Sequence, residues 1–284
     1  MIDERRAGWP REVKVRNFEN FPLALRPMKA QLPTVSVITV VYNARDLIEG
    51  TIDSVLAQTY PHLEYVIVDG ASTDGTLELI GRYADRIDRL VSEPDRGLYD
   101  AMNKGLEQAT GDFVWYINAG DRIFAPDTLE RVMEHYRPEV DVLYGEVMLV
   151  DDRRRQLGTR SELTVQKLPA RLSWRSLRRG MVVCHQGFLA RRDLAPPYRL
   201  DNLTADIEWV IRILQRSRGN VHTQLILAEY LQGGLSKKKH RQFMRDRYAV
   251  LRKYYGFLPN LLNHLLIVGR AAWWRIVRMG KDRY

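Results

Sequence analysis

Between residues 34 and 121 the chain alternates short β-branched apolar runs with stretches whose apolar residues recur at helical spacing, and this alternation strongly constrains the fold. The runs at 34–41, 63–68, 89–93 and 113–117 predict strands, and the stretches at 47–56, 77–83 and 98–109 predict helices. Strands that alternate with helices at this spacing imply an α/β fold, with a mostly parallel sheet and helices on both faces.

Polar residues follow each of these four runs. Asn43 and Asp69 follow the first two, the loop 95–97 follows the third, and the apolar run from Phe113 ends in Asn-Ala-Gly-Asp at Asp121. Because open α/β sheets bind ligands at the carboxyl ends of their strands, these residues predict a binding site at that edge. Neither a GxGxxG nor a GxxxxGK[ST] segment is present, so a dinucleotide fold and a P-loop lose their main support.

The second part of the chain has a looser texture. Helices are expected over 127–135, 205–216 and 237–255, and strands over 140–150, 182–189 and 221–231, the first of these strands bent at Gly145. We therefore expect an N-terminal arm over 1–32, one domain over 33–236 and a basic helical tail over 237–284. The turn Asn118–Asp121 is interpreted as the hinge between a nucleotide-holding half, 33–121, and an acceptor-facing half, 122–236.

The formal net charge of +9 is concentrated at the C-terminus. Residues 236–284 contain 13 Lys and Arg against two Asp, a net +11, so the preceding 235 residues contain 31 Lys and Arg against 33 Asp and Glu, a net −2. A near-neutral body argues against a nucleic-acid partner, because such proteins carry basic residues around their functional surface. The basic tail instead favours contact with an anionic surface.

Cysteine usage and hydropathy indicate the compartment. The single cysteine, Cys184, excludes an internal disulfide framework and a CxxC metal site, which favours a reducing environment and a packing role for this thiol. The N-terminus is charged, and no apolar run approaches the roughly 18–20 residues that span a bilayer. We therefore expect neither a secretory signal nor a transmembrane helix.

The tail has the composition of an interfacial helix. Apolar residues recur at helical spacing along it: Leu258, Leu261, Leu262, Leu265, Val268, Ala272 and Ile276. The pair Trp273 and Trp274 is close in sequence to three arginines, Arg270, Arg275 and Arg278. These features are typical of a helix that lies on an anionic leaflet. We expect a cytoplasmic protein, peripheral at the cytoplasmic face of the inner membrane; the alternative is a helix packed on the body.

Three segments together resemble the family 2 glycosyltransferases of the GT-A fold: Val35–Asn43, Val68–Thr76 and Asp112–Asp121. Four further segments are similar to the small bacterial branch typified by colanic acid and mycobacterial phenolic-glycolipid transferases: Glu93–Gly105, Cys184–Gln186, Ala205–Asp206 and Gly233–Ser236. The resemblance covers residues 33–240.

The resemblance implies inverting transfer of a sugar from a UDP- or GDP-linked donor to a hydroxyl of a glycan or lipid-linked acceptor, in surface polysaccharide or glycolipid biosynthesis. It assigns the donor site to Val41, Tyr42, Asn43, Asp69, Arg96, Gly97, Asn103 and Asn118. Asn43 and Asp69 would hydrogen-bond the base and the ribose. The loop 95–97 would offer backbone N–H groups and a cation to the diphosphate.

Asp121 matches the last acidic residue of the family's D-x-D-type motif, which the resemblance places on Mg²⁺ or Mn²⁺. Such an ion needs few protein ligands, because phosphate oxygens and water complete its shell. Asn118 and Gly120 stand where many relatives have Asp, so one carboxylate remains and weaker metal binding without donor is expected. No organic cofactor is implied.

Asp206 matches the family's catalytic Asp at the start of a helix, where it would take the acceptor proton. Glu208 is the second candidate for the base. His185, Gln186 and Trp174 are candidates for the acceptor side; a buried histidine and a packing tryptophan are the structural alternatives. Gly233, Gly234 and Ser236 are expected to form a flexible loop on the phosphate side.

Two other functions remain open from the sequence. The reduced acidic motif is compatible with a catalytically lapsed protein that binds nucleotide sugars or acts as a scaffold. A sugar-phosphate nucleotidyltransferase is disfavoured, because the chain lacks the Gly-rich, Arg/Lys-bearing loop near its first strand.

Overall fold

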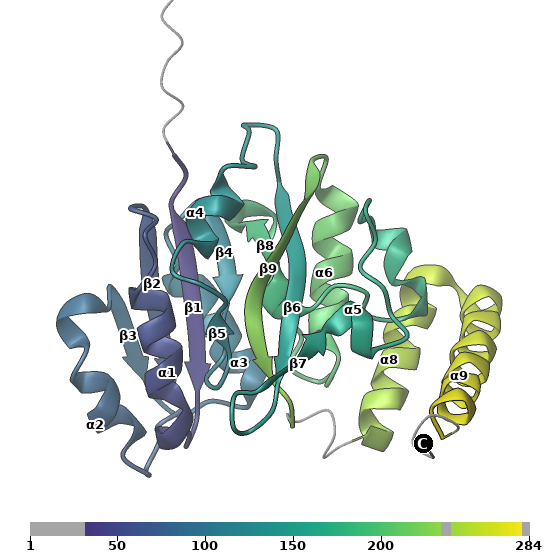
Figure 1. The fold of residues 1–284 in the computed structure, drawn as a ribbon, viewed down its shortest axis with the longest axis horizontal. Coiled ribbons are helices and arrows are strands. Elements are labelled where there is room, and N and C mark those ends of the chain that lie inside the picture. The colour runs from purple at the N-terminus through teal and green to yellow at the C-terminus, as the bar shows by residue number, and fades with distance from the viewer. Residues whose placement is uncertain (1–31, 234–239, 280–284) are drawn as a thin grey trace, which may run out of the picture. The chain divides into compact units, whose positions relative to one another are not determined.

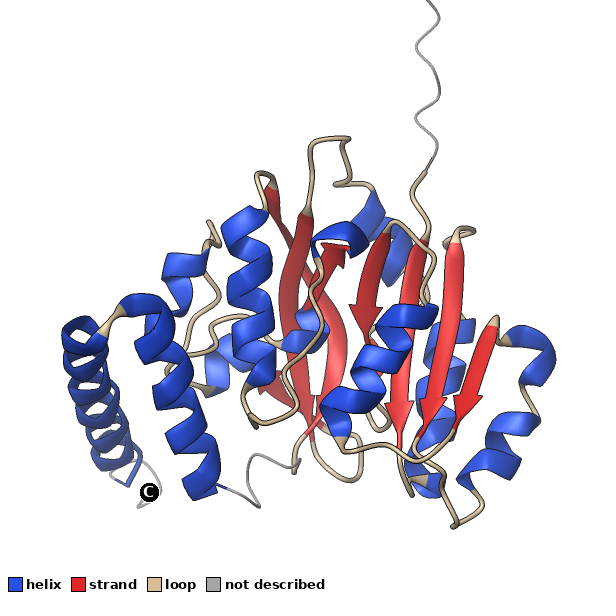
Figure 2. Cartoon of the chain, turned by 180° about the vertical axis from the view of Figure 1, so that it is seen from behind, coloured by secondary structure: helices blue, strands red, loops and turns tan. Residues whose placement is uncertain are grey.

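The computed structural model describes residues 32–233 and 240–279. The predicted arm, the loop residues Gly234 to Ser236 and the two ends of the predicted tail fall partly or wholly outside these ranges. Within them the chain forms a sheet in the order β3-β2-β1-β4-β8-β6-β9-β5, with β7 paired to β6, and helices lie against both faces (Figure 1, Figure 2).

The first part of the fold follows the predicted alternation closely. Its elements are β1 (Val35–Val41), α1 (Arg45–Leu56), β2 (Leu63–Asp69), α2 (Thr76–Gly81), η3 (Ala84–Arg86), β3 (Arg89–Ser92), α3 (Leu98–Gln108) and β4 (Phe113–Tyr116). The four strands are parallel to one another. Every residue of β1 and β4 is buried, as expected for strands covered by helices on both sides.

The second part contains β5 (Arg122–Ile123), α4 (Thr128–Met133), β6 (Val142–Val150), β7 (Gln156–Thr159), α5 (Arg160–Leu163), η4 (Trp174–Arg179), η5 (His185–Gly187), β8 (Phe188–Arg191), η6 (Arg192–Leu194), α6 (Ala205–Arg216) and β9 (Asn220–Leu231). The α/β class is confirmed. Besides the first four strands, β6 and β9 are parallel to each other. In contrast, β8 is antiparallel to β4 and β6, β5 is antiparallel to β9, and β7 is antiparallel to β6.

Two predicted strands differ in detail. The strand expected over 182–189 is wrong for its first six residues, since β8 begins at Phe188. Gly187 N donates to Cys184 O at 3.0 Å and closes a 3-10 turn before this strand. β6 runs through Gly145, and the predicted bend corresponds to a shift in its register with β9 around that residue. A Cβ at Gly145 would lie 2.6 Å from Leu225 O, so the two strands can meet only at a glycine.

Two hydrophobic clusters fill the spaces on either side of the sheet. One joins α1, α2 and α4 to the sheet through residues such as Ile48, Ile80 and Leu129. The other joins α3 and α6 to the opposite face and includes Met102, Tyr116 and Trp209. The alternation of buried residues along β1, where Val37 belongs to the first cluster and Ile38 to the second, follows from the period of two of a strand.

Two helices complete the described chain, α8 (His240–Tyr255) and α9 (Phe257–Met279). Val250 and Leu251 of α8 are buried in the cluster that contains α6. α9 packs against α8 and η4. Among the helices of the described ranges, none combines the length and the apolarity that a membrane span requires.

Candidate active site

The carboxyl ends of β1, β2 and β3 meet in one row, with Val41 beside Asp69 and Asp69 beside Ser92. Asp69 is fully buried, and its Oδ2 accepts hydrogen bonds from Ser92 Oγ at 2.7 Å and Ser72 N at 3.1 Å. Its Oδ1 is buried and has no hydrogen bond within the described part of the chain. A buried carboxylate oxygen without a donor is costly, so this atom is suited to accept from a ligand N–H or O–H.

An exposed tyrosine lies next to this row. A Cβ at Gly70 would lie 3.3 Å from the Tyr42 ring and 2.3 Å from Asp95 Oδ2, so glycine lets both approach the end of β2. Tyr42 is 64% exposed, which leaves its ring available for stacking. The backbone carbonyl of Val41, a residue predicted for the donor site, accepts a hydrogen bond from Gly70 N at 2.9 Å and so helps to hold the ends of β1 and β2 together.

Asn43 lies beside Tyr42 and shapes the next turn. It adopts a left-handed φ of 45°, and its Oδ1 accepts from Thr73 N at 2.9 Å. The side chain therefore ties the end of β1 to the loop that follows β2, with the remaining amide N–H₂ left for other partners.

The loop 95–97 differs from the expectation that its backbone would bind phosphate. Gly97 N donates to Asp95 Oδ1 at 2.7 Å, and Arg96 N donates to Asp100 Oδ2 at 2.9 Å. These N–H groups are therefore capped by the protein's own carboxylates. The Arg96 guanidinium pairs with Asp100 at 2.9 Å but its side chain is 76% exposed, so the cation rather than the backbone faces solvent here.

Asp121 closes the turn after β4 and is 6% exposed. Its Oδ2 accepts from Gln186 Nε2 at 2.7 Å, and its Oδ1 accepts from Leu231 N at 3.0 Å. The turn also rests on α1, because Thr51 Oγ1 donates to Asp121 O at 2.7 Å. Three elements distant in sequence thus hold this carboxylate in one orientation.

Burial raises the pKa of Asp121 to about 7, although hydrogen bonds from Leu231 and Gln186 and the charge of Arg154 act in the opposite direction. Arg154 donates from Nη2 to Gly120 O at 2.6 Å, and its Nη1 is buried without a partner in the described residues. Asn118 Oδ1, in the same turn, is also buried without a hydrogen bond there.

These observations fit a divalent cation at the turn. A hard cation would bind the unpaired Asn118 Oδ1, and its positive charge would stabilise the ionised form of the buried Asp121 carboxylate. The carboxylate oxygens keep lone pairs beyond those used by Gln186 and Leu231. No group of three or more His, Cys, Asp or Glu side chains suited to a metal occurs in the described ranges, so Asp121 would need oxygens from a ligand or water to complete a shell.

Asp206, in the first turn of α6, is the second carboxylate of the site. Its Oδ1 accepts from Ile207 N at 2.9 Å and from the Tyr99 hydroxyl at 3.3 Å. Burial raises the pKa of Asp206, while the Ile207 amide, Tyr99 and the charge of Arg160 lower it. Its Oδ2 has no hydrogen bond within residues 32–233 and 240–279, and the residue is partly exposed.

The two carboxylates act on the same two neighbouring groups. Burial raises the pKa of Cys184 to about 11 and also raises the pKa of Tyr230, and the negative charges of Asp121 and Asp206 add to both shifts. Arg160 acts on the same groups and donates to Val182 O at 3.0 Å, which fixes the segment before η5. The Cys184 thiol donates to Gln186 Oε1 at 3.1 Å, so this cysteine supports Gln186, which in turn holds Asp121.

Two predicted site residues are used in packing. His185 is 7% exposed, its Nε2 lies 2.7 Å from the Tyr198 hydroxyl, and burial lowers its pKa to about 4. Asn103 donates from Nδ2 to Tyr198 O at 2.9 Å and accepts from Tyr198 N at 2.6 Å. Both side chains thus support the fold around Tyr198. His185 Nδ1 is buried without a hydrogen-bond partner in the described residues, and the ligand-binding roles of His185 and Asn103 stay predictions.

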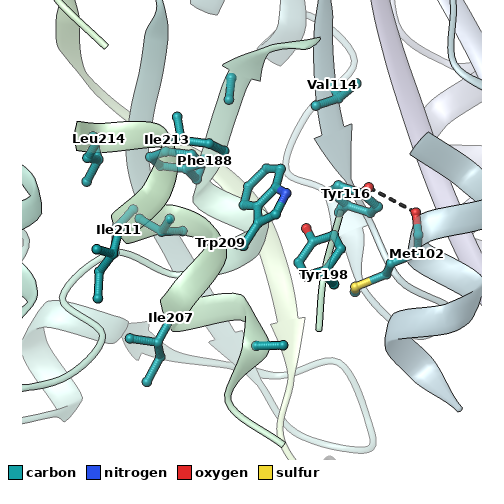
Figure 3. Packing of buried hydrophobic residues seen from close by; sticks show 14 of the residues in the cluster. Met102, Val114, Tyr116, Phe188, Tyr198, Ile207, Trp209, Ile211, Ile213 and Leu214 are labelled. Atoms are coloured by element: carbon teal, nitrogen blue, oxygen red, sulfur yellow. Dashed lines mark hydrogen bonds between the residues drawn. The ribbon is translucent and has the colours of Figure 1, made fainter. Parts of the chain in front are cut away.

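Tyr198 is the centre of an aromatic stack. It stacks on Tyr99, with ring centroids 5.5 Å apart, and on Trp209, with centroids 5.1 Å apart. Figure 3 shows Tyr198 and Trp209 beside Tyr116, whose hydroxyl bonds to Met102 O. The stack therefore joins α3, which carries Tyr99, to α6, which carries the base candidate.

Glu208 and Trp174 also differ from the expectation. Glu208 is 2% exposed and accepts from Lys253 Nζ at 2.6 Å and from the Tyr254 hydroxyl at 2.8 Å, so it fixes α8 to α6. Trp174 stacks on Tyr255 at 5.5 Å, which makes it an anchor for the end of α8. The packing alternative therefore describes Trp174, and Glu208 has a structural role that the sequence did not indicate.

The sequence did not single out Tyr99, Arg154, Arg160 or Tyr230. Tyr99 had one available signal, since it lies four residues before Asn103 on α3, and both contact the segment 198–206. For the others the sequence holds no local signal, because their partners lie on other elements.

Comparison with known proteins agrees with this geometry. The Glycosyl transferase family 2 matches residues 36–195, more than half of the chain. The PGL/p-HBAD biosynthesis glycosyltransferase of Mycobacterium bovis is 32% identical over 216 residues, covering 72% of this chain and 79% of that protein. The putative teichuronic acid biosynthesis glycosyltransferase TuaG of Bacillus subtilis is 45% identical over 105 residues, covering 36% of this chain; the match spans only 41% of TuaG.

Two solved structures share the fold. TarS of S. aureus in complex with UDP-GlcNAc superposes with a TM-score of 0.62 at 19% identity, over 77% of this chain and 64% of that one. The mannosyltransferase PcManGT of Pyrobaculum calidifontis, in complex with GDP-Man and Mn²⁺, gives 0.61 at 22% identity, over 93% and 84%. With the family match and the mycobacterial relative, the fold and the site lead to one conclusion: the chain belongs to glycosyl transferase family 2.

Proposed function

We propose that the protein transfers a sugar, with inversion, from a UDP- or GDP-linked donor to a hydroxyl of a glycan or lipid-linked acceptor, in surface polysaccharide or glycolipid biosynthesis. The observation that carries this proposal is that the buried carboxylates of Asp121 and Asp206, which come from distant parts of the chain, lie close enough to act on the same two groups, Cys184 and Tyr230. The names of the mycobacterial relative and of TuaG support the acceptor classes, and the ligands of TarS and PcManGT support the two nucleotides.

The donor base and ribose would lie against the row at the ends of β1 and β2. The exposed ring of Tyr42 would stack on the base, and the unpartnered Oδ1 of Asp69 would accept from the base or the ribose. Asn43 would add a hydrogen bond from its free amide N–H₂. Arg96, whose exposed guanidinium lies in the loop just before α3, would attract the diphosphate.

Asp121 and Asn118 would hold Mg²⁺ or Mn²⁺ through Oδ atoms, in an arrangement that donor oxygens complete. When bound, such an ion supplies charge stabilisation to the leaving diphosphate. Gln186 and Leu231 orient the carboxylate, and Arg154 adds a fixed positive charge beside it. No organic cofactor is needed for this reaction.

Asp206 would act as the base. As the acceptor oxygen bonds to the anomeric carbon, the bond to the diphosphate breaks on the opposite side, and the hydroxyl proton passes to Asp206 Oδ2. Oδ1 is engaged by Tyr99 and Ile207, which fixes the orientation and leaves Oδ2 for the acceptor.

The proposal includes a division of labour along the chain. Residues 33–121 would hold the donor and 122–236 the acceptor, with Asn118–Asp121 as the hinge between them. The segment from 237 would keep the enzyme at the cytoplasmic face of a membrane, where a lipid-linked acceptor resides.

Thermal unfolding with a panel of nucleotide sugars, with and without Mn²⁺, identifies the donor, because a ligand of the native state raises its melting temperature. Donor-dependent release of nucleoside diphosphate with an acceptor then tests transfer. Binding of a donor without any release would favour the lapsed binding or scaffold protein. Unchanged turnover in both Asp121→Ala and Asp206→Ala would refute the site.

A further inference from the structure

The helix α9 packs with its polar side inward. Asn260 is fully buried and Asn263 is 9% exposed, and both face the rest of the protein. Asn260 Nδ2 donates to Tyr248 O of α8 at 3.2 Å, and the His264 ring meets the Tyr248 ring edge-on at 4.9 Å. Asn263 and His264 lie three and four residues after Asn260, so the three side chains share one side of the helix.

The opposite side of the same turns is apolar and exposed. Leu258, Leu262 and Leu265 are 63%, 55% and 64% exposed, and Phe257, Leu261 and Leu266 are also exposed. A helix of a soluble domain normally places its apolar stripe toward the core. In α9 the arrangement is reversed, and rotation of the helix to bury the leucines would break the bond of Asn260 to α8.

The charge of the segment that carries this face selects its occupant. The sequence of α9 contains Arg270, Arg275 and Arg278 and no Asp or Glu, and residues 236–284 carry a net +11. An apolar face in a basic segment matches a bilayer with anionic headgroups, whereas a second copy of the same basic segment would repel it.

We propose that the exposed face of α9, from Phe257 to Leu266, docks on the surface of a membrane that contains anionic lipids. This inference rests on the proposed function for its purpose, since it would present the site to a lipid-linked acceptor. In Figure 1 this face lies in the N-terminal half of α9, and the helix runs from there toward the end of the fold where the carboxyl ends of β1 and β3 lie.

The docking helix is coupled to the base helix through α8. Asp246 of α8 accepts from Leu203 N at 2.9 Å, just before α6, and Lys253 pairs with Glu208 inside α6. A membrane bound to the exposed face of α9 would therefore have a defined position relative to Asp206, which lies two residues before Glu208.

Co-sedimentation of the full chain with phosphatidylcholine vesicles, with or without phosphatidylglycerol, tests the proposal. Wild type should sediment with the anionic vesicles and remain in solution with the neutral ones. The double variant Leu262→Glu/Leu265→Glu should bind about tenfold more weakly or worse, because two apolar side chains are replaced by charges. The matched control is Leu157→Glu/Leu200→Glu, which changes two other leucines, 44% and 39% exposed, in the same way.

The control variant should bind like wild type, and thermal melts should show both variants folded. Wild type that ignores anionic vesicles, or binds neutral ones equally, would overturn the proposal. So would a wild-type dimer by light scattering that becomes a monomer in Leu262→Glu/Leu265→Glu, because the face would then bind a second copy. Donor binding measured without vesicles separates this result from the proposed function, since it should be the same in wild type, the double variant and the control.

Discussion

The turn that carries Asp121 and the helix start that carries Asp206 hold their carboxylates in opposite ways. Both groups are buried enough to have raised pKa values. Asp121 has a hydrogen bond on each oxygen, from Gln186 and from Leu231. Asp206 has both of its hydrogen bonds on Oδ1.

This difference indicates two chemical roles. A carboxylate fixed on both oxygens has one orientation and suits a group that positions charge. A carboxylate fixed on one oxygen keeps the other for a proton and suits a base. Four experiments test whether the distinction holds, in order of decreasing expected effect.

The substitution Asp206→Asn should lower turnover by about a thousandfold, because an amide cannot accept the acceptor proton. Donor affinity should stay near wild type, since the role proposed for Asp206 is on the acceptor side. Steady-state kinetics and donor titration measure the two quantities. Asp201→Asn, an exposed carboxylate five residues earlier, is the control and should retain activity. Turnover within a few-fold of wild type in Asp206→Asn would assign the base elsewhere.

The substitution Asp121→Ala should lower turnover by about a hundredfold through loss of charge stabilisation at the diphosphate. In wild type, affinity for Mn²⁺ with nucleoside diphosphate should rise about tenfold per pH unit up to about pH 7, where the proton no longer competes with the ion. Calorimetric titration from pH 5 to 8 measures this slope. A pH-independent affinity, or the same slope in Asp121→Ala, would show that the ion binds to other groups.

The substitution Tyr99→Phe should reduce activity several-fold at low pH and little at high pH. The Tyr99 hydroxyl lowers the pKa of Asp206, so its loss raises that pKa, and the base is protonated over a wider acidic range. The acid limb of the kcat profile should therefore move to higher pH. Tyr83→Phe removes a hydroxyl that bonds Glu49 far from the site and should leave the limb in place. Equal profiles for the two variants would remove Tyr99 from the proton transfer.

The substitution Lys253→Met should lower the free energy of unfolding by about 1–2 kcal/mol, because it leaves the buried Glu208 without its closest cation. This loss of stability is smaller than for a fully buried ion pair, because the Lys253 side chain is 53% exposed and water screens its charge. Urea unfolding measures the change, and donor binding should be unaffected. A loss of donor binding without a loss of stability would contradict the role of Glu208 as an anchor.

Several site residues could be found from the sequence because they follow local patterns. Asp69 and Asp121 come directly after apolar runs, and Asp206 opens a helical stripe, so their places at strand ends and at a helix start required no knowledge of distant partners. The roles of His185 and Asn103 could not be decided from the sequence, for the opposite reason. Their partner, Tyr198, lies 13 and 95 residues away, and polar side chains satisfied by the fold look the same in sequence as polar side chains that await a ligand.

The sequence alone determined the alternation of strands and helices, the α/β class and the amphipathic period of α9, because these depend on local spacing and on the geometry of single elements. The tertiary structure decided which polar groups remain unpaired, which of the two buried carboxylates keeps an open oxygen and which side of α9 faces outward. Those properties depend on contacts between elements far apart in the chain, and no local pattern encodes them.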